Sequence, residues 1–163
     1  MLETEKLETI LNRQLAWIVA ADSRLSLLLP LSTAMLGALA AYAPRPSDWN
    51  LSCGIPAAFA IFFLCLSIAF CALAFFPRTS GTKGSIIFFE GINSRNLDQY
   101  QDYLASCRTE DYNSDLVQQC YINATIASIK FTWIKRGMAS LFVSALPWAL
   151  TIYQFYGLRH AHV

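Results

Sequence analysis

Three stretches of the chain hold no charged side chain and are long enough to cross a lipid bilayer. They cover residues 25–43, 53–76 and 137–156, and the second reads CGIPAAFAIFFLCLSIAFCALAFF. A helix needs about 20 mostly apolar residues to span the hydrocarbon core. Lipid offers no hydrogen-bond partners to the backbone, so each stretch is predicted to form a transmembrane helix.

A further helical pattern precedes the first of these spans. Its apolar positions recur at helical spacing, and they are Leu2, Leu7, Ile10, Leu11, Leu15, Ile18 and Val19. No strong helix breaker follows, so one helix is predicted from about residue 3 to residue 42. Its apolar side can lie on a membrane or on a neighbouring helix. The acidic polar side disfavours an anionic lipid surface, so packing on a neighbour is favoured.

The region between the second and third spans predicts two more helices. Residues 97–107 read as a short helix with Asn96 as its cap. A longer pattern begins at Leu116 and continues without proline into the third span, which gives a helix of roughly 40 residues and about 60 Å. The predicted fold class is therefore an all-α membrane protein with three long transmembrane helices, cytoplasmic helical extensions and a small cytoplasmic insertion.

Lysine and arginine near the span ends predict the orientation, because they accumulate on the cytoplasmic side. One side collects Arg13, Arg24, Arg78, Lys83, Lys130, Lys135 and Arg136, and the other collects Arg45 and Arg159. The N-terminus is therefore predicted to be cytoplasmic. The expected segments are an amphipathic helix at 1–24, transmembrane helices 1 and 2 within 25–76, a cytoplasmic element and long helix at 77–136, transmembrane helix 3 at 137–157, and an external tail at 158–163.

Composition agrees with a membrane protein and gives little support to catalysis. Charged residues make up 14% of the chain, against about 25% in soluble domains. The net charge of +1 does not favour a general nucleic-acid coat. The five cysteines show no metal-ligand spacing, and no glycine-rich phosphate loop or Ser/His/Asp set is present. We therefore expect neither an enzyme nor a bound metal or cofactor.

Three segments of the chain resemble the Pycsar effector transmembrane domain family. They are AADSRLSLLL before the first span, IIFFEGINSRNLDQYQDYL after the second, and DLVQQCYINATIASIKFTWIKRGMASL leading into the third. In that family a small-Asp-x-Lys/Arg motif opens the first span, a Phe-Phe-x-x-Ile element precedes a tyrosine-bearing helix, and a lysine precedes the last span. The matching residues are Asp22, Arg24, Phe88, Phe89, Ile92, Tyr100 and Lys130. The resemblance covers about residues 8–157.

The resemblance implies a membrane effector of bacterial antiphage defence in the inner membrane. Such effectors sense a nucleotide signal and depolarise or permeabilise the membrane, which arrests growth in an abortive infection. Many of them carry a separate cyclic-nucleotide-binding domain, for which 163 residues leave no room. In size and logic the chain is similar to the stand-alone membrane effectors of Hailong defence systems, which implies a nucleotidyltransferase partner whose nucleic-acid product gates the effector.

A channel would require a homo-oligomer, because three spans from one chain cannot enclose a roomy conducting path. A tetramer or a similar small ring is expected. Two stripes of small polar residues are candidates to line the pore, and they are Ser26 and Thr33 in the first span and Ser140, Ser144 and Thr151 in the third. The alternative is close helix packing, with each hydroxyl bonded to its own helix. No acid or base lies inside a span, which favours a hydrophobic gate.

Basic residues at the cytoplasmic membrane edge are candidates for phosphate binding. They are Arg78, Lys83, Lys130, Lys135 and Arg136, and the alternative is that they only set topology and contact lipid headgroups. Asp22, Arg24 and Lys130 are candidates for coupling a signal to the spans, because charges from the first and third helices would meet at one depth. A simpler alternative is an Asp22–Lys130 or Asp22–Arg136 pair that only fixes packing.

Two functions from different classes remain open at this point. The first is an oligomeric ion channel that a nucleotide or nucleic-acid signal gates through its cytoplasmic helices. The second is a non-conducting membrane anchor or scaffold for a cytoplasmic nucleotidyltransferase or another defence enzyme. A small transporter is disfavoured, because inverted repeats and intramembrane charges are missing from the sequence.

Overall fold

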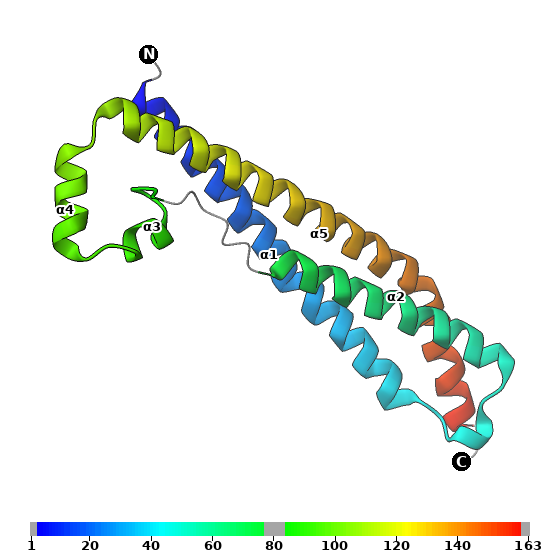
Figure 1. Cartoon of the computed structure of the whole chain (residues 1–163). Coiled ribbons are helices and arrows are strands. Elements are labelled where there is room, and N and C mark those ends of the chain that lie inside the picture. The colour runs from blue at the N-terminus through cyan, green and yellow to red at the C-terminus, as the bar shows by residue number, and fades with distance from the viewer. Residues whose placement is uncertain (1–2, 77–83, 161–163) are drawn as a thin grey trace. The chain divides into compact units, whose positions relative to one another are not determined.

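The computed structural model describes residues 3–76 and 84–160, and every regular element among them is a helix. The elements in chain order are α1 (Thr4–Tyr42), the short 3-10 turn η1 (Pro46–Asp48), α2 (Leu51–Phe75), α3 (Phe89–Asn93), α4 (Leu97–Ser106) and α5 (Thr109–His160) (Figure 1). Helices α1, α2 and α5 are long and apolar enough to cross a membrane. The all-α fold class with three such helices is therefore confirmed.

The two longest helices are continuous. Helix α1 runs unbroken for 39 residues, as the sequence pattern predicts. Helix α5 has 52 residues and begins at Thr109, earlier than the pattern that starts at Leu116. Its first turn carries Glu110 and Asp111, and acidic side chains stabilise the amino end of a helix. This end effect extends the helix beyond the region where apolar periodicity can show it.

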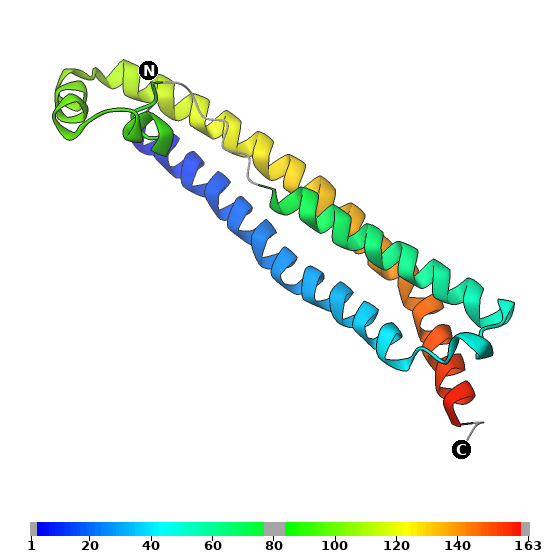
Figure 2. The same cartoon turned by 60° about the horizontal axis from the view of Figure 1, so that its bottom comes forward.

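The described chain forms two compact units, and α1 and α5 contribute to both. The first, which we name the insertion unit, consists of Met1–Ala21 with Pro77–Lys130. The second, which we name the span unit, consists of Asp22–Phe76 with Phe131–Val163. Helices α3 and α4 belong to the insertion unit, whereas all of α2 belongs to the span unit (Figure 2). Each unit is described separately below.

Helix α2 packs through a row of mostly small side chains. Its buried residues alternate in steps of four and three, and they are Cys53, Ala57, Ala60, Leu64, Ser67, Cys71 and Ala74. That spacing keeps one side of a helix against its neighbours, and small side chains let the backbones approach closely. Across the unit, the indole Nε1 of Trp148 donates to the backbone oxygen of Met35 at 2.9 Å, which gives this mid-span tryptophan a polar partner.

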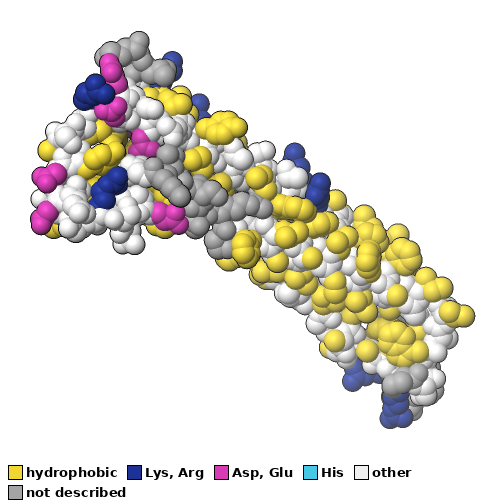
Figure 3. All heavy atoms as spheres, in the orientation of Figure 1, with side chains coloured by type: hydrophobic (Ala, Val, Ile, Leu, Met, Phe, Trp, Pro, Cys, Tyr) yellow, Lys and Arg dark blue, Asp and Glu magenta, His cyan; other side chains and the backbone are white. Residues whose placement is uncertain are grey.

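The outward surface of the span unit is bulky and apolar on two of its three helices. Helix α2 exposes Leu51, Ile55, Phe59 and Phe62, and α5 exposes Phe142, Val143, Leu146, Leu150 and Tyr153. Hydrophobic side chains gather over this unit in the space-filling view (Figure 3). Such a surface would favour aggregation in water, but it is the surface that lipid chains require.

Candidate functional site

Two buried serines link the three helices of the span unit. The Ser32 and Ser67 hydroxyl oxygens lie 3.1 Å apart, and both side chains are fully buried. Ser67 can donate to the backbone oxygen of Gly137 at 3.0 Å, and Ser32 can donate to that of Leu28 at 2.9 Å. We name this set the hydroxyl chain. It connects α1, α2 and α5 inside the apolar interior.

The hydroxyl chain has two proton arrangements, because each serine owns one proton. In one, Ser32 donates to Ser67 and Ser67 donates to Gly137. In the other, Ser67 donates to Ser32 and Ser32 donates to Leu28 within its own helix. The α1–α2 link is present in both arrangements, but the α2–α5 link is present in only one.

The small polar stripe of the third span lies in the interior of the span unit. Ser144 and Thr151 are fully buried and Ser140 is nearly so. Ser144 donates to Leu141 O at 2.7 Å and Thr151 donates to Pro147 O at 2.8 Å, so both hydroxyls bond within their own helix. This is the placement that the packing alternative describes. Lining of a pore by these three residues stays a prediction, and it would require α5 to turn.

The small polar stripe of the first span lies on the surface. Ser26 donates to Ser23 O at 2.8 Å and Thr33 donates to Pro30 O at 2.9 Å, and both side chains are exposed. A Cβ added at Gly37 would meet no atom within 4 Å in the described structure. The exposed small residues on this side of α1 form what we name the small face, and they are Ser23, Ser26, Pro30, Thr33, Ala34, Gly37, Ala40 and Ala41.

Two of the predicted basic residues at the start of the spans rest on aromatic rings. The Arg24 guanidinium lies over the Phe131 ring, 5.1 Å from its centroid. The Arg136 guanidinium lies 4.7 Å from the Trp133 ring centroid, and Trp133 in turn stacks on Phe70 at 5.7 Å. Cation–aromatic pairs of this kind suit the edge of a membrane, where tryptophan and arginine gather.

The remaining basic and coupling candidates are placed as follows. Lys135 is exposed, whereas Asp22 and Lys130 are partly buried. Arg78 and Lys83 lie outside the described residues. Phosphate binding by the basic residues, and the Asp22 pairs with Lys130 or Arg136, stay predictions.

A buried carboxylate anchors the insertion to α5. Asp115 is 8% exposed, and its Oδ2 accepts from the Ser85 hydroxyl and from the Ile86 N–H, each at 2.8 Å. The Ser85 oxygen also accepts from Phe88 N–H at 2.9 Å and from the Gln119 amide at 3.3 Å. We name this set the Ser85–Asp115 anchor. It fixes the start of the insertion on the side of α5.

The chain after the anchor folds back tightly on itself. Arg95 donates through Nη1 to Gly91 O at 2.6 Å and through Nη2 to Gly84 O at 3.0 Å, and its guanidinium covers the Tyr103 ring at 4.3 Å. A Cβ at Gly91 would lie 2.2 Å from the backbone oxygen of Ser85, so only glycine fits there. The insertion is therefore held by polar contacts rather than by a large apolar core.

The family motif residues after the second span take part in this insertion. The Tyr100 hydroxyl donates to Ile86 O at 3.1 Å, which ties α4 to the segment that the anchor fixes. The Phe88 and Phe89 rings contact each other, with centroids 4.5 Å apart. Asn96 caps α4 as predicted, because its Oδ1 accepts from Gln99 N–H at 2.8 Å.

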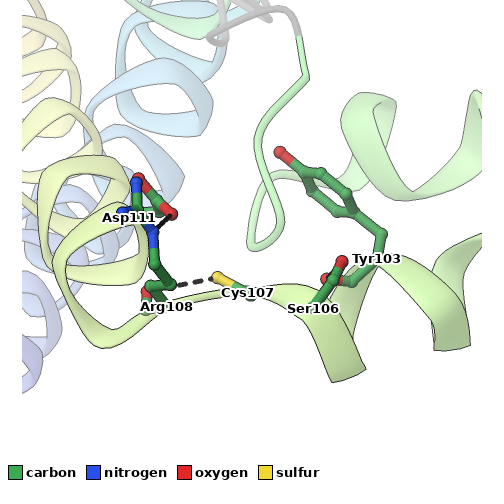
Figure 4. A network of polar contacts seen from close by, with 5 residues as sticks. All are labelled: Tyr103, Ser106, Cys107, Arg108 and Asp111. Atoms are coloured by element: carbon green, nitrogen blue, oxygen red, sulfur yellow. Dashed lines mark hydrogen bonds and ion pairs between the residues drawn. The ribbon is translucent and has the colours of Figure 1, made fainter.

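The corner between α4 and α5 is polar but shows no sign of a binding site (Figure 4). Arg108 donates through Nε to Asp111 Oδ2 at 3.1 Å, and both side chains are largely exposed. Ser106 and Cys107 bond only to nearby backbone oxygens. Exposed ion pairs stabilise a fold little, so this network shapes the turn between two helices.

The beginning of α1 packs on α5 inside the insertion unit, which confirms the preferred prediction for the amphipathic helix. Leu7 is buried, the Thr4 hydroxyl donates to Asn113 Oδ1 at 2.8 Å, and the Tyr112 hydroxyl donates to Glu8 Oε1 at 3.0 Å. Burial raises the pKa of the Tyr112 phenol above its ordinary value of 10.0, and the hydrogen bond and charge of Glu8 raise it further.

The raised pKa of Tyr112 predicts a loss of stability at alkaline pH. The fold favours the neutral phenol, so this contribution is complete below pH 10 and declines as the pH rises through the higher pKa of the folded state. Thermal unfolding followed between pH 8 and about pH 11 should therefore fall more steeply for the wild type than for Tyr112→Phe. Tyr121→Phe, at a phenol 75% exposed on the same helix, is the control and should keep the wild-type slope. Equal slopes for wild type and Tyr112→Phe would contradict the assignment.

The model of the Pycsar effector protein domain family matches residues 6–155 of the chain. The chain belongs to the Pycsar effector protein domain family. No curated protein and no solved structure matches it. Membership indicates a membrane effector of antiphage defence, in agreement with the three helices able to span a membrane. The Pycsar effector domain is a membrane effector and not a known enzyme family.

Several residues that build the two units were not singled out from the sequence. They are Ser32, Ser67 and Gly137 in the span unit and Ser85, Gly91, Arg95 and Asp115 in the insertion unit. A signal existed for α2, because its small residues recur in strict steps of four and three. The contacts of Asp115 join residues about 30 positions apart, and no local spacing marks them.

Proposed function

We propose that this Pycsar-family protein is an oligomeric ion channel that depolarises the membrane and arrests growth when a nucleotide or nucleic-acid signal arrives. It would reside in the bacterial inner membrane as a tetramer or a similar small ring, with its N-terminus in the cytoplasm. The observation that carries the proposal is the small face of α1. It is the one long surface of the described span unit without bulky side chains at its centre, although Leu27 and Leu31 border it.

The physics of helix association in lipid supports this assignment. Lipid chains are as apolar as leucine, so helices associate through close packing of small residues and through hydroxyl contacts. The bulky exposed rows of α2 and α5 suit contact with acyl chains, whereas the small face suits contact with other subunits. Around a symmetry axis, Ser26 and Thr33 would place hydroxyl oxygens along the path of an ion, with apolar positions between them as the gate.

Continuous helices provide a route from signal to gate. Helices α1 and α5 each pass from the insertion unit into the span unit without a break. The coupling candidates fall at this passage, since the boundary lies between Ala21 and Asp22 in α1 and between Lys130 and Phe131 in α5. Arg24 follows directly in α1. A signal bound at the insertion unit opens the channel only if its affinity differs between closed and open states.

Basic side chains near this passage are the proposed phosphate contacts. Lys130, Lys135 and Arg136, together with Arg78 and Lys83, would attract the phosphates of a nucleotide or oligonucleotide. A nucleotidyltransferase partner would supply that signal. In a ring of subunits each of these positions is repeated around the axis, which raises the local positive charge.

The channel is tested by recording currents from purified protein in planar bilayers. The wild type should give discrete current steps in the presence of the signal. Thr33→Leu and Ser26→Leu should reduce the unitary conductance to a small fraction, because each fills the small face with an apolar side chain. Ala145→Leu makes the same kind of change on an exposed position of α5 and should conduct like the wild type.

Two outcomes would contradict this proposal. Wild-type protein that is folded and inserted, yet silent at all signal concentrations, would favour the anchor or scaffold role instead. Full conductance in both small-face variants would show that the path lies elsewhere.

A further inference from the structure

The span unit contains a cavity of about 520 Å³ between the start of α2 and the end of α5. It lies at the opposite end of the spans from Arg24 and Arg136, next to the link that joins α1 to α2. Its lining includes Asn50, Ser52, Tyr153, Gln154 and Tyr156, and none of the residues around it is ionisable as Asp, Glu, Lys or Arg.

The amide of Gln154 points to a missing partner. Its Oε1 is buried and has no hydrogen-bond donor among the residues that the structure describes. Buried polar atoms are nearly always paired, because an unpaired one loses its hydration without compensation. Gln154 lines the cavity, so a group that enters the cavity can supply the donor after a small turn of the amide.

The aromatic wall of the cavity selects the charge of that group. Tyr153 and Tyr156 are 79% and 54% exposed and border the cavity. Their ring faces attract alkylammonium groups, and no cationic side chain lines the cavity to repel one. A primary ammonium also offers N–H donors, which the unpaired amide oxygen of Gln154 requires.

The opposite wall suits a phosphate and an acyl chain. The amino end of the 25-residue helix α2 borders the cavity, and this end of a helix attracts negative charge. The exposed apolar row Leu51, Ile55, Phe59 and Phe62 begins there and follows α2 along the span. Phosphate, primary ammonium and acyl chains occur together in one class of molecule, the ethanolamine phospholipids.

We propose that this cavity binds the headgroup of an ethanolamine phospholipid, with the ammonium against Tyr153 and Tyr156 and bonded to Gln154. The phosphate lies at the amino end of α2, and one acyl chain follows the apolar row of that helix. The site is separate from the small face of α1, so it goes beyond channel activity and does not depend on it.

The test measures lipid retention by purified full-length protein in detergent with native mass spectrometry. Phosphatidylethanolamine should be retained in preference to phosphatidylcholine, which lacks N–H donors, and to phosphatidylglycerol, which lacks the cation. Gln154→Leu should weaken phosphatidylethanolamine binding by about tenfold, the effect of losing one hydrogen bond to a charged group. Tyr153→Leu, at a largely exposed side chain that folding does not need, should weaken it as well.

The controls decide every outcome. Phe142→Leu removes an exposed aromatic ring of α5 away from the cavity and should bind lipid like the wild type. Equal retention of the three lipids, or unchanged binding by both variants, means that only water fills the cavity and overturns the proposal. Glycerophosphoethanolamine that binds as tightly as the lipid overturns the lipid assignment in favour of a soluble amine. No current is measured, so failure here is distinguishable from failure of the channel.

Discussion

Replacing Gly91 by alanine will release the insertion from α5 and expose it to protease. The added Cβ would lie 2.2 Å from the Ser85 oxygen and 3.1 Å from the Ser85 carbonyl carbon and nitrogen. These are backbone atoms, and the Ser85–Asp115 anchor holds them, so they cannot move aside unless that anchor breaks. The Arg95 bond to Gly91 O would be lost in the same event.

Limited trypsin digestion measures this release, because Arg95 lies inside the segment. In the wild type the Arg95 guanidinium is bound to backbone oxygens, and cleavage after it should be slow. In Gly91→Ala the cut should be faster by about tenfold or more, since protease cleaves locally opened chain. Circular dichroism should change little, because α1, α2 and α5 remain.

The matched control is Gly37→Ala, which adds the same methyl group where no described atom lies within 4 Å. Its cleavage pattern should equal that of the wild type. A Gly91→Ala protein with wild-type cleavage after Arg95 would show that the insertion does not adopt the close fold described above.

The second large effect is expected at Gly137, where α5 meets its neighbours in the span unit. A Cβ there would lie 3.2 Å from Leu28 Cδ2, 3.5 Å from Ser67 O and 3.6 Å from Phe70 Cβ. Alanine needs only a small shift of the flexible Leu28 side chain. Leucine has no room, so it should push α5 away from α1 and α2 and break the Ser67–Gly137 bond. The expected loss of stability is about 3 kcal/mol, the upper range for an overpacked interior.

Unfolding in mixed detergent micelles measures this loss, with the helical signal followed as denaturing detergent is added. Gly137→Leu should unfold well before the wild type, and Gly137→Ala should lie close to the wild type. Gly157→Leu is the control on the same helix, because no described atom lies within 4 Å of a Cβ there. If Gly137→Leu and Gly157→Leu unfold together, the contact of α5 with α1 and α2 at Gly137 is absent in the real protein.

Elements that depend on local pattern could be predicted from the sequence. Continuous α1 follows from the lack of a breaker before its span, and α4 follows from Asn96 and the helical spacing after it. The early start of α5 could not be seen, because capping charges rather than apolar periodicity set it. The family resemblance is confirmed and rests on short motifs at three places in the chain.

The candidate site was harder to predict than the helices, because small polar residues serve both helix packing and pores. Ser26 and Ser144 look alike in the sequence, but one is exposed and the other is fully buried. Which side of a helix meets a neighbour depends on all three helices together. Likewise, Gly91 and Asp115 act through contacts between distant segments, and composition alone gives them no special standing.

The alternative proton arrangement of the hydroxyl chain has a mechanical consequence. When Ser67 turns its proton to Ser32, helix α5 loses its polar tether but no hydroxyl is stranded in an oily environment. The third span can then slide or rotate against the other two with little penalty beyond the loss of close contact. The span unit therefore contains a latch that can be undone by rotating two single bonds.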